Sequence, residues 1–341
     1  MKKQKKNYLE VLRVVAVILV IFNHTDLNWA YYHDTHSIIT FMVSLLVSLA
    51  VKIDIPLFFC ISGALLIAKE ESITFIWKKR IARILMVLVL FSGAQYIFKV
   101  LRGKIENGSI KDFLIRLLQG NIQETFWFLY AYIAFLIVLP LLKCLARSIT
   151  ISEYLLLVSI VIIVEIYSYI EGVTGFYIHA SLINELRICL SYGLYWISGY
   201  FIDNNYELLK SKKYIKTIVI IMFFVELVFP LISSLYVFIK YESFVDPIVN
   251  NSMKLIPLVL FGIFRGVSFD EKNVAVKLGK YCFAIYLVEQ FIRVLFFNIY
   301  VYNIGVLPGV IGSTIYAILT FLGALLVAFL LKKVPLLNKI I

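Results

Sequence analysis

The stretch Tyr8–His24 reads YLEVLRVVAVILVIFNH, and it decides the class of fold. Between Val11 and Phe22 it is apolar apart from a single charge, Arg13. Together with its flanks, a run of this kind is long enough to cross the hydrocarbon core of a bilayer as a helix. Because Asn23 and His24 follow it, and no small-residue cleavage site does, we interpret it as a retained membrane span rather than a signal peptide.

The composition of the whole chain extends this interpretation. Of the 341 residues, 62% are apolar and 16% are charged, and the mean hydropathy is +0.92. A soluble globular protein has about 45–50% apolar and about 25% charged residues. These values exclude a soluble enzyme, a disordered chain and a coiled coil. They predict an all-α polytopic integral membrane protein, one domain over residues 1–341, with about ten transmembrane helices at 9–30, 38–68, 84–101, 125–142, 151–170, 187–203, 215–239, 253–269, 278–299 and 309–331.

The net charge of +12 is explained by the same membrane topology. In a soluble protein such an excess would suggest a nucleic-acid partner, but here the basic residues form short clusters between apolar runs, so no nucleic-acid partner is expected. If both termini are cytoplasmic, about two thirds of the 33 Lys and Arg residues fall on the cytoplasmic side, as the positive-inside rule requires. The same topology puts the four histidines at or near the outer face: His24, His33, His36 and His179.

Two segments are predicted to depart from straight spans. The segment 38–68 is too long for one span and is interrupted by Lys52, Asp54 and Pro56, which predicts a broken helix. The loop 102–123 has apolar residues spaced like one face of a helix, which predicts an amphipathic helix lying in the outer interface: Ile110, Phe113, Leu114, Leu117 and Leu118.

Charged side chains inside a span are costly, and this makes the first span the best candidate for a functional site. Arg13 and His24 are eleven residues apart, which is close to three full turns, so they share one helix face about 16 Å apart along the axis. Glu10 is three residues before Arg13 and can pair with it. Two interpretations are open: Arg13 snorkels and His24 is an ordinary interfacial residue, or His24 transfers a proton near neutral pH.

Several motifs are distributed over essentially the whole chain. The first is YLEVLR (8–13), with Arg13 and His24 in R-x10-H spacing. The later ones are IPLFFCISGALL (55–66), KRIARIL (79–85), FWFLY (126–130) followed by PLL (140–142), and GKYCFAIYL (279–287). In their order and spacing these motifs resemble those of the membrane acyltransferase-3 family, and YLEVLR resembles its opening motif.

The resemblance implies an integral membrane O-acyltransferase that moves an acyl group, usually acetyl, from cytoplasmic acyl-CoA to a hydroxyl of an extracytoplasmic cell-surface glycan. The expected partners are therefore acyl-CoA (acetyl-CoA) as co-substrate, the glycan acceptor and the lipid bilayer; a homodimer is left open. The expected location is the plasma membrane of a bacterium, because acyltransferases of this kind act there and because the Lys- and Ile-rich composition fits a low-GC bacterium.

The resemblance also implies roles for individual residues. His24 is the expected catalytic base or acyl relay. Arg13 is also counted as a catalytic candidate and is expected to line the donor path and to hold or orient CoA. Arg80 and Arg83 lie on one helix face before the third span, where guanidinium groups suit phosphate, although a positive-inside cluster would look the same. The candidate substrate-binding residues are Ser62, which could equally serve helix packing, and Trp127 and Tyr130, which could equally be belt aromatics.

One position departs from the family pattern. After the late IYL motif relatives often carry His, whereas this chain has Glu289, which we count as a catalytic candidate because a carboxylate can act as acid or base. The alternative is that Glu289 forms an ion pair with Arg293, four residues later. No metal is expected, because the loose cluster of His33, Asp34 and His36 has no further ligand of suitable spacing nearby.

A different class of function is compatible with the same features. Intramembrane charges and a broken helix also suit a carrier or flippase for a lipid-linked sugar or polysaccharide. Against this, no inverted repeat is evident, and the polar residues cluster in the first span.

Overall fold

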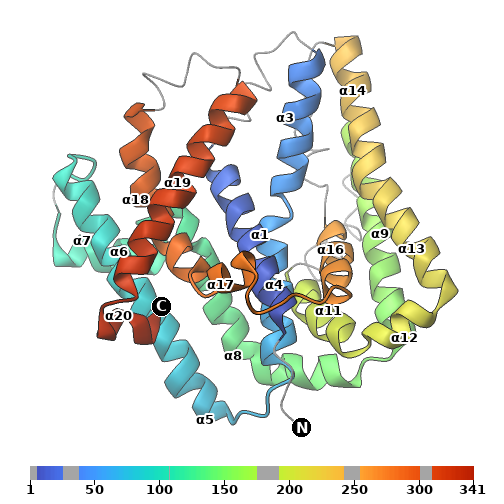
Figure 1. The fold of residues 1–341 in the computed structure, drawn as a ribbon, viewed down its shortest axis with the longest axis horizontal. Coiled ribbons are helices and arrows are strands. Elements are labelled where there is room, and N and C mark those ends of the chain that lie inside the picture. Colours follow the sequence, from blue (N-terminus) through green and yellow to red (C-terminus); the bar gives the residue numbers. More distant parts are fainter. Residues whose placement is uncertain (1–5, 26–37, 107, 175–191, 242–253, 300–308) are drawn as a thin grey trace.

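A computed structural model describes residues 6–25, 38–106, 108–174, 192–241, 254–299 and 309–341. Within these ranges the chain is helical and contains no strand. The long helices stand side by side, and the N-terminal end of α1 and the C-terminal helix α20 both lie in the lower half of Figure 1. The elements are α1 (Asn7–His24), α3 (Ile38–Val51), α4 (Asp54–Leu66), α5 (Ile73–Phe75), η1 (Ile76–Ile81), α6 (Ala82–Leu101), α7 (Ile110–Gln119), η2 (Glu124–Phe126), α8 (Trp127–Ser148), α9 (Ile151–Thr174), α11 (Gly193–Asn204), α12 (Tyr206–Ser211), α13 (Lys213–Phe223), η3 (Phe224–Val228), α14 (Phe229–Tyr241), α16 (Ile256–Arg265), α17 (Val274–Gly279), α18 (Cys282–Ile299), α19 (Gly309–Leu331) and α20 (Pro335–Ile340).

Six helical segments of the described chain are long and apolar enough to cross a membrane: Asn7–His24, Phe41–Leu66, Ile73–Leu101, Glu124–Ser148, Lys213–Lys240 and Ile311–Leu331. They correspond to six of the ten spans expected from the sequence. The other four positions are also helical, as α9, α11, α16 and α18. The shortest of these helices is α16, with 10 residues. The all-helical membrane fold is therefore confirmed, whereas the count of ten and the cytoplasmic location of the termini stay predictions.

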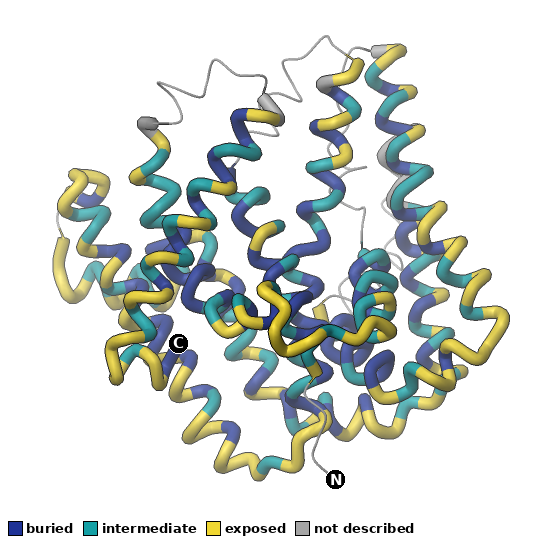
Figure 2. The backbone as a smooth tube through the Cα atoms, in the orientation of Figure 1, coloured by how far each residue is buried: buried dark blue, intermediate teal, exposed yellow. Residues whose placement is uncertain are grey.

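Helix α1 lies in the middle of the bundle (Figures 1 and 2). It contacts α3, α4, α16, α17, α18 and α19. Most of its apolar side chains are buried, and Leu12, Ala16 and Val17 have no exposed surface, whereas Ile18 is 37% exposed. Because α1 is surrounded by protein on most sides, its polar residues face other helices rather than lipid. Burial of this kind is where intramembrane charges acquire functions.

Helices α4 and α11 pack very close together, and two glycines make the approach possible. A Cβ atom on Gly63 would lie 1.9 Å from the backbone oxygen of Trp196, and one on Gly199 would lie 1.9 Å from that of Cys60. Either distance is far below van der Waals contact, so only glycine fits. Gly63 lies at this close contact, whereas the role of the neighbouring Ser62, for which helix packing was one interpretation, stays a prediction.

Both predicted departures from straight spans are present. The segment 38–68 is divided into α3 and α4 at Lys52 and Ile53, and Asp54 begins the second helix. The amphipathic helix is α7, which begins after Ser109, whose side chain accepts a hydrogen bond from the backbone N–H of Asp112 (3.1 Å). Ile110 and Leu118 are more than four-fifths exposed, as expected of an apolar face that lies against lipid.

Candidate active site

His24, the last residue of α1, lies against Glu289 in the middle of α18. The Nδ1 atom of His24 is 2.8 Å from Oε1 of Glu289, and the Glu289 side chain is fully buried. A buried carboxylate at this distance stabilises the tautomer in which Nδ1 carries the hydrogen, and it leaves Nε2 free to accept a proton. The His24 side chain is 18% exposed, so its ring can be reached by a second molecule.

Arg293, one turn further along α18, holds His24 from the backbone side. Its guanidinium donates to the backbone oxygen of His24 and to the side chain of Gln290. The sequence left open an ion pair between Glu289 and Arg293, whereas the structure gives Glu289 a different partner, His24. Helix α18 thus fixes both the ring and the backbone of His24.

Asp54 is a further carboxylate beside His24, and the sequence analysis treated it only as a break in a helix. It is 4% exposed, and its Oδ2 accepts a hydrogen bond from Nδ2 of Asn23 (3.1 Å), the residue before His24. The other oxygen, Oδ1, accepts from the backbone N–H of Ile55 (2.5 Å) at the start of α4, where the helix dipole favours negative charge. The sequence signal that could have identified it is an acidic residue directly before the IPLFF motif.

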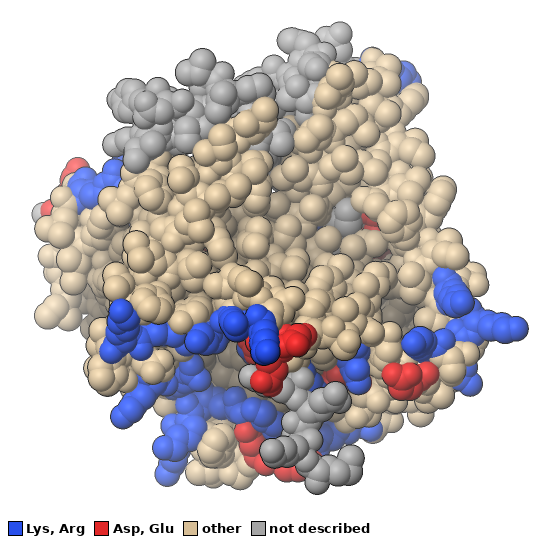
Figure 3. Space-filling view, viewed as in Figure 1, with Lys and Arg blue, Asp and Glu red and all other residues tan. Residues whose placement is uncertain are grey.

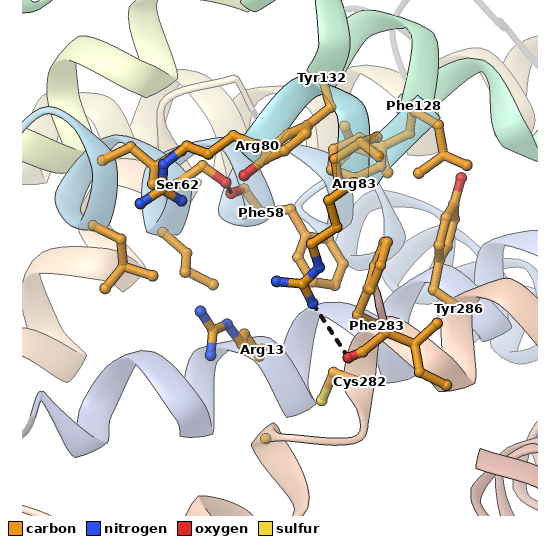
Figure 4. Close-up of a pocket in the computed structure, with 18 of the residues that line it drawn as sticks. Arg13, Phe58, Ser62, Arg80, Arg83, Phe128, Tyr132, Cys282, Phe283 and Tyr286 are labelled. Carbon is orange, nitrogen blue, oxygen red and sulfur yellow. Dashed lines mark hydrogen bonds between the residues drawn. The ribbon is translucent and has the colours of Figure 1, made fainter. Parts of the chain in front are cut away.

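Toward the other end of α1, Arg13 lines a cavity of about 340 Å³. Figure 4 shows Arg13, Arg80, Arg83 and Ser62 arranged around it. Nη1 of Arg13 bonds to Glu10 (2.6 Å), which confirms the predicted ion pair within the helix. The cavity also carries Lys69 and Lys280, so its polar lining is strongly basic, whereas its walls are apolar: Ile55, Phe58, Ile61, Leu65, Leu66, Ile84, Phe128, Leu129, Phe283 and Ile341.

Both arginines of the KRIAR segment already have partners within the chain. Arg80 forms a two-point ion pair with Glu71, with contacts of 2.6 and 2.5 Å. This pairing holds the pKa of the Glu71 carboxyl below its usual range. Arg83 donates to the backbone oxygens of Ile340 (2.8 Å) and Ile341 (3.3 Å), the latter drawn as a dashed line in Figure 4. An incoming anion would therefore compete with the Glu71 carboxylate at Arg80 and with the main-chain oxygens of Ile340 and Ile341 at Arg83.

The three candidate substrate-binding residues are not brought together. The hydroxyl of Ser62 lines the cavity, donates to the backbone oxygen of Phe58 (2.8 Å) and faces Tyr132. Trp127 is 41% exposed and packs on the ring of Tyr192 at 5.5 Å, as a belt aromatic would. The hydroxyl of Tyr130 donates to the backbone oxygen of Leu117 and so attaches α7 to α8.

Helix α18 contributes to both the cavity and the His24–Glu289 pair. Tyr286 lines the cavity, and Glu289 follows it by three residues, which is about 4.5 Å along a helix axis, although neither Glu289 nor His24 lines the cavity itself. His33, Asp34, His36 and His179 lie outside the described residues.

Another group of buried charges, absent from the sequence-based predictions, lies on α9, η3 and the start of α16. Nζ of Lys254 pairs with Glu165 (2.5 Å), and Glu226 accepts from the backbone N–H groups of Leu255 (2.5 Å) and Ile256 (3.0 Å). The carboxylate of Glu226 thus occupies the N-terminal end of α16, a favourable place for a negative charge. These contacts explain the burial of Glu226 as helix capping.

The family model described as "Acyltransferase domain", acyltransferase-3, matches residues 6–333. The chain belongs to the acyltransferase-3 family. No curated protein and no solved structure matches it. The match covers every element from α1 to α19, and so includes the His24–Glu289 pair and the basic cavity. Family membership and the apolar helices together make this acyltransferase-3 protein a multi-pass membrane acyltransferase.

Proposed function

We propose that this acyltransferase-3 protein is an O-acyltransferase that transfers acetyl from cytoplasmic acyl-CoA to a hydroxyl of a cell-surface glycan on the other side of a bacterial plasma membrane. The observation that carries the proposal is the contact of 2.8 Å between Nδ1 of His24 and Glu289. It supplies an imidazole whose Nε2 can accept the proton of a hydroxyl group. A carrier that does not move protons would have no need of a base oriented in this way.

In the proposed reaction the acceptor oxygen attacks the thioester carbonyl carbon, a C–O bond forms and the C–S bond breaks. Nε2 of His24 takes the hydroxyl proton, and that proton ends on the CoA sulfur, so the products are the ester and the free thiol. The positive charge that develops on the ring is stabilised by the carboxylate of Glu289. An alternative order, in which Nε2 first receives the acyl group and then passes it to the hydroxyl, uses the same nitrogen.

The donor is proposed to enter the basic cavity. CoA carries phosphates at its nucleotide end, and Arg80, Arg83, Lys69 and Lys280 supply positive charge at the cavity. Its pantetheine arm is nearly neutral and suits the apolar walls, while Arg13 lies along the path. Arg13 and His24 are about 16 Å apart along α1, which is consistent with a donor and an acceptor that approach from opposite faces of the membrane.

The test is acyl transfer by the full-length protein in lipid nanodiscs with radiolabelled acetyl-CoA and the glycan of the host cell. We expect His24→Ala to lower transfer by about 10²–10⁴-fold, the range typical of general-base catalysis, with normal expression and folding. Gln119→Ala, an exposed polar change at the end of α7, is the matched control and should leave the rate unchanged. A well-expressed His24→Ala protein that acylates within threefold of wild type would refute the mechanism and favour a carrier.

A further inference from the structure

A second basic recess lies on the other side of Arg80 and Arg83 from the cavity. It is an open groove between η1 and α20 with a volume of about 450 Å³. Its basic side chains are Arg80 and Arg83 together with three lysines that the cavity does not share: Lys78, Lys79 and Lys339. Among the described residues that line the groove none is acidic. Figure 3 shows Lys and Arg side chains gathered along the lower edge of this face of the molecule.

The position of the groove along the chain places it at a membrane interface. Lys78 and Lys79 are in the first turns of the candidate span Ile73–Leu101, where the chain enters the bilayer. Phe75 and Trp77 beside them are 45% and 50% exposed, and aromatic side chains of this kind concentrate at the headgroup level. The groove is therefore open to the region in which lipid phosphates lie.

The walls of the groove favour a ligand with both a phosphate and an apolar tail. Phe75 lines the groove, and so does Met86, which is 47% exposed and about three turns further into the span. A tail that runs from the lysines past Met86 would lie along the lipid-facing side of α6. The nucleotide end of CoA has no such apolar tail. Its phosphates can also bind Lys69 and Lys280 in the cavity, so CoA does not need the groove.

We propose that this groove binds the phosphate headgroup of an anionic phospholipid. The ammonium groups of Lys78 and Lys79 on η1 and of Lys339 on α20 contact the phosphate from two sides, and the acyl chains follow Phe75 and Met86. The bound lipid joins η1 to α20, the helix whose last residue, Ile340, also accepts a hydrogen bond from Arg83. Basic recesses between transmembrane helices are suited to anionic headgroups. The proposal does not depend on the acyl-transfer reaction.

The test is binding of short-chain phosphatidylglycerol to the full-length, delipidated protein in detergent, measured by native mass spectrometry. We expect phosphatidylglycerol to bind and phosphatidylcholine, which has no net charge, to bind much more weakly. The variant Lys78→Gln/Lys79→Gln/Lys339→Gln should weaken phosphatidylglycerol binding by at least about tenfold, since each lysine contributes to the attraction of an anionic lipid. Should this triple variant express poorly, Lys78→Gln/Lys79→Gln alone should still weaken it.

The matched control removes three exposed lysines near the start of α13: Lys210→Gln/Lys212→Gln/Lys213→Gln. It should change phosphatidylglycerol binding by less than about twofold. The proposal is overturned if the groove variants bind phosphatidylglycerol like wild type. It is also overturned if the control variant loses as much affinity, since any basic surface of the protein would then attract the lipid. Displacement of the lipid by 3′,5′-ADP would also overturn it, because the occupant would then be the nucleotide end of the donor.

Discussion

Glu289 lies 265 residues after His24, and its Oε1 is 2.8 Å from the imidazole Nδ1. The carboxylate is fully buried, so the contact is made where water does not weaken it. A carboxylate of α18 thus contacts the histidine of the first span. This geometry supports the proposal that His24 acts as a base and that Glu289 orients its ring.

The first prediction concerns this contact. We expect Glu289→Gln, which keeps a hydrogen-bonding side chain but loses the negative charge, to lower kcat by about 10²-fold or more with little change in the KM for acyl-CoA. Steady-state kinetics with varied acyl-CoA measures both constants. Gln119→Ala, at the exposed end of α7, is the control and should leave both constants unchanged. A Glu289→Gln enzyme with normal kcat would show that Glu289 has only a packing role.

The second prediction concerns the arginines at the cavity. Arg80→Ala and Arg83→Ala should each raise the KM for acyl-CoA by about 10–100-fold, because each removes a charge-assisted contact with phosphate, while the KM for the acceptor stays the same. Arg102→Ala, an exposed arginine after α6, is the control. An unchanged donor KM in the double variant would leave these residues as a positive-inside cluster.

The third prediction is a pH dependence at Glu71. Because Arg80 holds the pKa of the Glu71 carboxyl below its usual value of about 4.3, the pair stabilises the protein at and above that pH, and the contribution is lost as the pH falls through the lower value of the folded protein. Glu71→Gln should therefore have a lower Tm than wild type between pH 5 and 8, by a constant margin that shrinks below about pH 4.

Thermal unfolding in detergent at each pH measures this margin. Glu207→Gln, a change at an exposed carboxylate of α12, should unfold like wild type throughout. A margin that already disappears between pH 7 and pH 6 would contradict the assignment, since a carboxylate with a lowered pKa does not titrate there.

The fourth prediction concerns the contact between α4 and α11. Gly63→Ala places a methyl group 1.9 Å from the backbone oxygen of Trp196, and backbone cannot move aside as a side chain can. Overpacking of this kind costs about 1–3 kcal/mol or more, so we expect a clearly lower Tm. Gly193→Ala is the matched control, because nothing lies within 4 Å of its added methyl group. Equal Tm values for the two variants would contradict the close packing.

The fifth prediction concerns topology. In a background without the native cysteines, Lys272→Cys should be protected from a membrane-impermeant maleimide added to intact cells, and Asn121→Cys in the loop after α7 should be labelled. Both positions are exposed or partly exposed loop residues, so access depends on the side of the membrane. Strong labelling at position 272 from outside would reverse the orientation and with it the proposed direction of transfer.

The sequence by itself determined what depends on local order along the chain. Helical periodicity places Arg13 and His24 on one face of α1, pairs Glu10 with Arg13, separates α3 from α4 at Lys52, and makes α7 amphipathic. These features follow from a repeat of 3.6 residues and from the length of an apolar run, so they can be derived from any stretch of about twenty residues. The family motifs rest on the same kind of local spacing.

Only the tertiary structure decided which helices meet. His24 contacts Glu289, and Arg80 pairs with Glu71. Arg83 donates to the backbone of Ile340 and Ile341, and Tyr130 donates to the backbone of Leu117. None of these pairs follows from spacing along the sequence. In a chain that is 62% apolar most helix faces are alike, so hydropathy does not distinguish a protein-facing side from a lipid-facing one. The choice is made by close packing at small residues such as Gly63 and by the need to satisfy each buried charge.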